Sequence, residues 1–415
     1  MKTGNILPPR AFHIVTCLIA LAGVIALQSF VLAQESFKPG PPDMRISRED
    51  RLKVFAKLWD RVNKEYFDPQ FNGVNWAQMK EKYRPQVEGA KNKIQLYDVL
   101  QNMLDGLHSS HLELYLDMDF GTGLRIQPGP KQNPIRVEDR WVVRSPDDGS
   151  GAQLAGVQHG WILTYWNGEP YGSGLKTTCD PGENVHLRFI DLQAQERNLD
   201  VACRIYPWAS THNSPERSTQ TLDGGAVYLR FTKFQHGADG WLADQVAIHR
   251  SAPAIIMDLR RNGGGEFAVV QKCFYPFFSE PTVFGEVRNR NGKVSTTLKV
   301  PGSGKGAYRG RVFVLIDEAS GSGAEVFAAG LQESGRAIVI GRQSMGAVLN
   351  AREHKLPNGF TVDIPHSDYR TARGVRLEGR GVIPDEQVKL TMKNFLENRD
   401  ADLERVRELL QKRLP

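Results

Sequence analysis

Apolar side chains recur at helical spacing in an early part of the chain. Ser47 can cap a helix through its hydroxyl, and acidic residues follow it in the first turn. Apolar positions then repeat every three or four residues over residues 52–66. Two more helices are predicted over residues 76–83 and 94–107. We therefore expect a small helical region over residues 46–117.

The pattern changes over residues 118–206 to short runs of β-forming residues that alternate with turns. A short helix is expected at residues 151–156, where a glycine can end it. These features predict a compact β-rich module. Its strands are expected at residues 123–126, 141–144, 161–166 and 185–189.

Strand and helix patterns alternate over residues 207–391. Several strands are apolar runs with little polar alternation, so both of their faces are expected to be buried. This order predicts βαβ units with a central sheet flanked by helices. The remaining residues, 392–415, are expected to form a C-terminal amphipathic helix. The strands are predicted at residues 226–231, 253–259, 311–317 and 337–341, and the helices at 239–250 and 323–334.

The N-terminus carries a long apolar segment. Lys2 and Arg10 precede it, and it runs from residue 11 to residue 32. This arrangement predicts a secretory signal peptide over residues 1–33, cleaved after Ala33. A membrane span needs about 20 apolar residues, so an uncleaved anchor is the alternative. Either way the body of the protein is expected to be exported, as a periplasmic, secreted or membrane-anchored protein.

A Pro- and Gly-containing linker is expected over residues 34–45. Across the 415 residues, Lys and Arg exceed Asp and Glu by 53 − 47 = 6, and no long basic block concentrates this charge. Nucleic acid is therefore not expected as a partner. An exported protein can form disulfides, and Cys179–Cys203 is the more plausible pair, which leaves Cys273 buried. The cysteine spacing predicts no zinc site, and no other metal or cofactor is expected.

Two loops that follow buried strands carry the candidate chemistry. The first contains three consecutive glycines, Gly263 to Gly265, whose amides could point at an anion. The second places Ser322 between glycines where a strand passes into a helix, so that helix amides would favour negative charge beside it. Ser320 and Ser322 could instead serve only as helix caps. Active sites of α/β sheets gather at the carboxyl ends of such strands.

Five segments together resemble the S41 serine peptidases, the C-terminal-processing and tricorn-core family, and they occur in that family's order. The resemblance implies that Ser322 is the nucleophile, because it lies three residues before Glu325. It also implies that Gly323, Gly264 and Gly265 donate to the oxyanion. The implied fold is multidomain α/β, with a helical N-terminal region, a PDZ-like β module and an αβ catalytic domain of the ClpP/crotonase-like type. The segments are residues 228–234, 258–265, 322–325, 335–341 and 377–385.

The chain departs from the processing proteases at one position. Where they carry a catalytic Lys, this sequence has Ala347, which cannot act as a base. The tricorn-like branch uses a His from the helical region and a Glu near the C-terminal end. By resemblance, His111 is the base here and is supported by Ser110 and Glu378. His108 is an alternative base, and Glu333 is an alternative acid.

The segment over residues 151–168 resembles a PDZ domain, with His159-Gly160 where such domains usually carry Gly-Asp. A PDZ-like module would bind the C-terminal end of a polypeptide substrate by adding it to a sheet edge. The predicted function is an exported serine endopeptidase that works through an acyl-enzyme. The alternatives are an inactive S41-like scaffold that binds peptides or other ligands, and hydrolysis of a small ester or amide.

Overall fold

A computed structural model describes residues 44–117, 125–126, 134–144, 146, 150–172, 179, 182–203 and 217–412. The predicted signal peptide (1–33) and nearly all of the predicted linker (34–45) lie outside the described residues. In the described part of the chain, no helix has the length and apolar character needed to cross a membrane.

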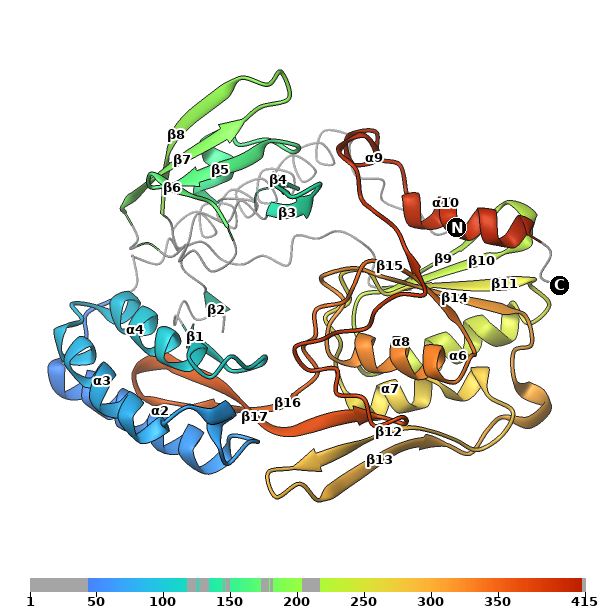
Figure 1. The fold of residues 1–415 in the computed structure, drawn as a ribbon, viewed down its shortest axis with the longest axis horizontal. Helices are drawn as coiled ribbons and strands as arrows, with labels where there is room; N and C mark the ends of the chain where they lie inside the picture. The colour runs from blue at the N-terminus through green and yellow to red at the C-terminus, as the bar shows by residue number, and fades with distance from the viewer. Residues whose placement is uncertain are drawn as a thin grey trace, which may run out of the picture. The chain divides into compact units, whose positions relative to one another are not determined.

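The predicted N-terminal helices are present as α2 (Arg48–Glu65), α3 (Trp76–Gly89) and α4 (Lys93–Asp105) (Figure 1). Each begins after a polar residue whose side chain accepts a hydrogen bond from a backbone N–H of the first turn: Ser47, Asn75 and Asn92. Such caps satisfy N–H groups that have no partner within the helix.

The predicted central sheet has the strand order β18-β15-β14-β11-β10-β9. Its neighbouring strands from β10 to β18 are parallel, and β9 is antiparallel to β10. All five residues of β11 are buried, as predicted for a strand covered on both faces. The bounds are β9 (Arg217–Thr221), β10 (Val227–Phe231), β11 (Ala254–Asp258), β14 (Arg311–Ile316), β15 (Ile338–Gly341) and β18 (Glu386–Gln387).

Helices cover both faces of this sheet, as Figure 1 shows. On one face, Ile255 and Met257 of β11 pack with α6 (Ala238–Ile248), α7 (Phe267–Cys273) and α8 (Gly323–Glu333). Cys273 of α7 is free and buried, as expected. On the opposite face, Ile256 packs in a cluster with Val406 of the C-terminal helix α10.

The C-terminal residues form two helices where we expected one. These are α9 (Met392–Leu396) and α10 (Ala401–Gln411), and both lie within the range of residues 392–415 that was predicted to be one helix. Thr391 caps α9 and Asp400 caps α10, each through its side chain. α9 already ends at its C-cap Glu397, and Asp400 then starts α10 as its N-cap.

A second sheet, which the sequence patterns did not predict, has the strand order β13-β12-β17-β1-β2, with β16 also paired to β17. Strand β1 directly follows the N-terminal helices, and it is antiparallel to β17 of the C-terminal half. This pairing brings residues 108–111 beside the C-terminal half of the chain. The bounds are β1 (Glu113–Asp117), β2 (Arg125–Ile126), β12 (Thr282–Asn289), β13 (Val294–Val300), β16 (Asn350–Lys355) and β17 (Phe360–Thr371).

The β-rich module contains a third sheet with the order β3-β4-β5-β7-β8, and β6 pairs with β5. The short helix α5 (Gly151–Leu154) lies where it was predicted. The predicted disulfide between Cys179 and Cys203 is present. The bounds are β3 (Pro134–Val137), β4 (Arg140–Val143), β5 (Ile162–Trp166), β6 (Glu169–Pro170), β7 (Asn184–Ile190) and β8 (Glu196–Ala202).

Candidate active site

Ser322 lies at the turn between strand β14 and helix α8. Its φ is 52°, in the left-handed region that non-glycine residues seldom adopt, and its exposed fraction is 9%. Such a backbone is maintained only when its surroundings hold it. Here the Ser322 N–H donates to Ala347 O at 2.7 Å and to Glu325 Oε2 at 2.9 Å.

Ser320 has a structural role, which separates it from Ser322. Its buried hydroxyl donates to Leu259 O at 2.8 Å and accepts from the Asp317 N–H at 2.9 Å. These bonds join the loops that follow β11 and β14. The geometry therefore supports the choice of Ser322 over Ser320 as the candidate nucleophile.

The glycine loop after β11 lies directly against Ser322. A Cβ built on Gly264, whose φ is 91°, would lie 2.4 Å from Gly323 N and 2.5 Å from Ser322 Cβ. Only a residue without a side chain allows this approach. Asn262 maintains the loop, because its Oδ1 accepts from the Gly264 N–H at 2.9 Å and its Nδ2 donates to Phe231 O at 2.9 Å. The sequence analysis did not identify Asn262.

Two backbone amides are available to an oxyanion. Within the described part of the chain, the N–H groups of Gly265 and Gly323 have no hydrogen-bond partner. A Cβ on Gly323 would lie 3.3 Å from Gly265 N, so the two residues are neighbours. Of the three predicted donors, Gly264 differs, since its N–H is already bonded to Asn262. The geometry therefore favours Gly265 and Gly323 as the donors.

Ser110 and Glu378 are joined by two hydrogen bonds. The Ser110 N–H donates to Glu378 Oε1 at 2.9 Å, and its hydroxyl donates to Glu378 Oε2 at 2.8 Å. The Ser110 Oγ also lies 2.9 Å from His111 Nδ1. Because a serine hydroxyl has one proton, which is directed to Glu378, Oγ must accept from a protonated Nδ1. The neutral ring then has a free lone pair on Nε2.

Residues 347–348 connect these groups to the candidate nucleophile. Ala347 O accepts from the Ser322 N–H at 2.7 Å, and the next N–H, that of Val348, donates to Glu378 Oε2 at 3.0 Å. Ser110 and His111 from the N-terminal region thus lie beside Glu378 and residues 347–348 of the C-terminal half. The Ser322 hydroxyl and the His111 ring are not hydrogen-bonded in this structure. Catalytic hydrogen bonds often form only when substrate is bound.

Glu325 organises the surroundings of Ser322, although the sequence analysis used Glu325 only to select Ser322 as the candidate nucleophile. Its side chain is fully buried and accepts from Ser322 N–H, Ser344 Oγ at 2.6 Å, Gly346 N–H at 2.7 Å and Ala347 N–H at 2.8 Å. Burial raises the pKa of Glu325, while the hydrogen bonds from Ser344 and the backbone oppose this shift. The position of the absent Lys is occupied by Ala347 within this network.

Burial also affects the pKa of the candidate base, His111. It lowers the pKa of His111 from its ordinary value of 6.5, because a charged ring loses hydration there. The carboxylates of Glu378, Glu113 and Asp363 act in the opposite direction. A lowered pKa keeps the ring neutral at neutral pH, which is the form that accepts a proton.

The alternative base His108 and the alternative acid Glu333 make no hydrogen bond to Ser110, His111 or Glu378 among the described residues. His108 is exposed, and no hydrogen bond joins it to the described site residues. Glu333 bonds instead to Arg373, whose guanidinium donates to Glu333 O at 2.8 Å. Geometry therefore favours His111 and Glu378 over these two.

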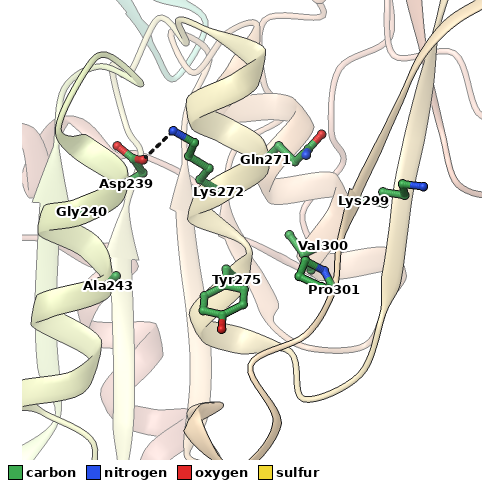
Figure 2. Close-up of a pocket in the computed structure, with 9 residues that line it drawn as sticks. All are labelled: Asp239, Gly240, Ala243, Gln271, Lys272, Tyr275, Lys299, Val300 and Pro301. Atoms are coloured by element: carbon green, nitrogen blue, oxygen red, sulfur yellow. Dashed lines mark ion pairs between the residues drawn. The ribbon is translucent and has the colours of Figure 1, made fainter.

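A pocket of about 300 Å³ is formed by residues of α6, α7 and the end of β13. Figure 2 shows Lys272 directed at Asp239, with which it forms an ion pair over 3.5 Å. Tyr275, Val300 and Pro301 also line it (Figure 2). None of the predicted site residues belongs to this pocket, so it is separate from the candidate active site.

Comparison with known families identifies the class of protein. Residues 225–388 match the model of peptidase family S41, and residues 47–105 match the tricorn protease C1 domain. The chain is thus a serine-type peptidase by class. More narrowly, residues 225–388 form a peptidase family S41 domain, as the sequence motifs indicated.

Individual relatives support this assignment. A carboxyl-terminal-processing protease of Synechocystis is 24% identical over 371 residues, which cover 84% of this chain and 83% of the relative. The putative tricorn protease homolog 2 of Streptomyces coelicolor is 26% identical over 380 residues, covering 82% of this chain but 30% of that protein.

Solved structures show that the fold is shared. A photosystem II D1 C-terminal processing protease has a TM-score of 0.55 at 19% identity, covering 88% of this chain and 98% of that one. Mature CPAF in complex with lactacystin has a TM-score of 0.67 at 15% identity and the same coverages.

Proposed function

We propose that this protein is an exported serine endopeptidase that cleaves polypeptides through an acyl-enzyme. Ser322 Oγ attacks the peptide carbonyl while His111 Nε2 takes its proton. The N–H groups of Gly265 and Gly323 stabilise the oxyanion, and His111 then protonates the leaving amine. Water resolves the ester by the same route. Ser110 and Glu378 hold the ring in the required tautomer.

The observation that carries this proposal is the hydrogen-bonded series His111–Ser110–Glu378, attached through Val348 to the segment that also binds Ser322. It supplies a base without the lysine that Ala347 replaces. Export is supported by the N-terminal apolar segment. The β-rich module is proposed to be PDZ-like and to bind substrate ends, and the catalytic domain to be ClpP/crotonase-like.

The test uses a fluorophosphonate probe and an unfolded polypeptide substrate. We expect the probe to modify Ser322, identified by peptide mapping, and to stop cleavage of the polypeptide in proportion to labelling. Fragment ends read by mass spectrometry would define specificity. Labelling of another serine, or cleavage that persists in fully labelled protein, would contradict the proposal.

A second candidate is an inactive scaffold that binds peptides, which the replacement of the family lysine by Ala347 favours. It predicts saturable binding of unfolded peptides without fragments and without probe labelling. The same experiment therefore separates the two functions.

The pH profile tests the assignment of His111. Because burial lowers its pKa, the acid limb of kcat/KM is expected below pH 6.5, with activity kept on the alkaline side. In Glu378→Gln the limb should move to still lower pH, since a carboxylate that raises the pKa of His111 is gone. The kcat should also fall, by roughly 10²-fold, because the ring loses its orienting group.

Glu333→Gln is the matched control, since Glu333 binds Arg373 and not Ser110. It should leave both the limb and kcat unchanged. A limb that does not move in Glu378→Gln, or one that moves equally in the control, would refute the proposed role of Glu378.

A further inference from the structure

The C-terminal helix α10 is attached to the catalytic domain by a partly buried cluster of charges. Arg260 Nε donates to Asp258 Oδ1 at 2.9 Å, and Nη2 donates to Asp258 Oδ2 at 2.6 Å. Its Nη1 and Nη2 each donate to Asp400 at 2.8 Å, and Nη1 donates to Asp402 Oδ2 at 2.9 Å. A guanidinium has five N–H donors, so all those of Arg260 are used.

Asp402 is the centre of this cluster. Only 3% of its side chain is exposed, and its carboxylate binds a second guanidinium, with Arg342 Nη1 at 2.9 Å from Oδ1 and 3.1 Å from Oδ2. One carboxylate on α10 therefore joins Arg260 to Arg342. Charge-assisted bonds of this kind fix direction as well as distance.

The two arginines belong to the two segments that build the active site. Arg260 opens the loop in which Asn262 holds Gly264 against Ser322. Arg342 opens the segment that leads to Ala347, whose carbonyl accepts the Ser322 N–H. The same segment supplies the Gly346 and Ala347 amides that bind Glu325.

We propose that Asp402 is a positioning residue for catalysis, which sets the oxyanion loop and the nucleophile-supporting segment relative to each other through Arg260 and Arg342. This inference rests on the proposed peptidase function. The C-terminal helix thereby supports the active site through Asp402 alone, and it supplies no catalytic residue.

The charges around Asp402 favour a fixed arrangement of Arg260 and Arg342. Burial alone lowers the pKa of Arg260, but its bonds and charge contacts with Asp258 and Asp400 raise it, so the guanidinium stays charged. Without the charge of Asp402, Arg260 keeps Asp258 and Asp400 and Arg342 keeps Glu318, but no shared anion joins the two guanidinium groups. The two segments that carry them are then free to shift relative to each other. A displacement of about 1 Å at a reacting centre can cost roughly 10²-fold in rate.

The test compares Asp402→Asn with Val406→Ala in the full chain. Val406 lies on the same helix and is fully buried against Ile256 and Phe313, so its truncation loosens α10 without touching the charges. We expect Asp402→Asn to lower kcat by about 10–10²-fold with little change in KM. The rate of fluorophosphonate labelling at Ser322 should fall in parallel. Val406→Ala should lower Tm but keep kcat.

Amide hydrogen exchange supplies a readout that is independent of activity. In Asp402→Asn, peptides covering residues 259–265 and 342–348 should both exchange faster than in the wild type, and in Val406→Ala they should not. Unchanged kcat and exchange in Asp402→Asn, or equal losses of kcat in both variants, would overturn the inference. If the wild type neither cleaves the substrate nor reacts with the probe, the proposed function is wrong. Faster exchange of both segments in Asp402→Asn would still show that Asp402 holds them.

Discussion

Replacing Ser322 by alanine is expected to reduce kcat on the order of 10⁶-fold, the loss seen when a serine nucleophile is removed from a catalytic triad. The fold should remain intact. Alanine carries a Cβ as serine does, so it experiences the same backbone at φ 52°. The Ser322 N–H would still donate to Ala347 and Glu325. Steady-state cleavage of an unfolded polypeptide, beside thermal unfolding, measures both effects.

Ser320→Ala is the matched control for this prediction. It removes the buried hydroxyl that bonds to Leu259 O and the Asp317 N–H, so the free energy of unfolding should fall by about 1–3 kcal/mol. Its kcat should exceed that of Ser322→Ala by several orders of magnitude, because the nucleophile remains. Equal activity of Ser322→Ala and the wild type would mean that another group attacks the substrate.

The parallel sheet could be predicted because its central strands carry their signal locally. Apart from Asp258 at the end of β11 and Arg311 at the start of β14, both strands are continuous apolar runs, and their burial on both faces follows from that composition. The helices α6 and α8 were likewise predicted, since α6 precedes β11 and α8 follows β14 in the alternating pattern. The local sequence was sufficient to predict a strand or helix wherever the element's own residues indicate its burial.

The second sheet could not be predicted for the opposite reason. β16 is a polar strand, and most of β13 is exposed, so neither has a clear apolar pattern. β17 contains Pro365 and Asp368 among its apolar residues. Its pairing with β1 joins distant parts of the chain. Such strands are specified by their partners rather than by their own periodicity.

The residues of the candidate site likewise fall into those that a local motif reveals and those that only the structure reveals. Ser322 and the glycine run were found because each stands in a short contiguous motif. Glu325, Asn262 and Asp402 act through partners in other segments, and Asp402 lies 142 residues beyond Arg260, one of the two arginines that it binds. A buried carboxylate or amide in a sequence does not reveal which loop it holds. The supporting groups could therefore be identified only in the folded chain, whereas the candidate nucleophile and glycine loop could be identified from the sequence.

Gly264→Ala is expected to abolish most activity, by about 10²–10³-fold or more in kcat, because it distorts the oxyanion site. The new Cβ would lie 2.4 Å from Gly323 N and 2.5 Å from Ser322 Cβ, distances that real Cβ atoms do not tolerate. The φ of 91° adds strain for any side chain. Either the glycine loop or the start of α8 must move, and both carry a proposed oxyanion donor.

Gly263→Ala is the neighbouring control in the same loop. A Cβ there would meet no atom within 4 Å, and the φ lies outside the left-handed region. It should keep kcat within a few-fold of the wild type, measured by peptide hydrolysis and by the rate of fluorophosphonate labelling. The contrast is diagnostic because the two variants add the same methyl group to adjacent residues. If both lost activity equally, general disturbance of the loop would explain the loss, and the close approach of Gly264 to Ser322 and Gly323 would not be its cause.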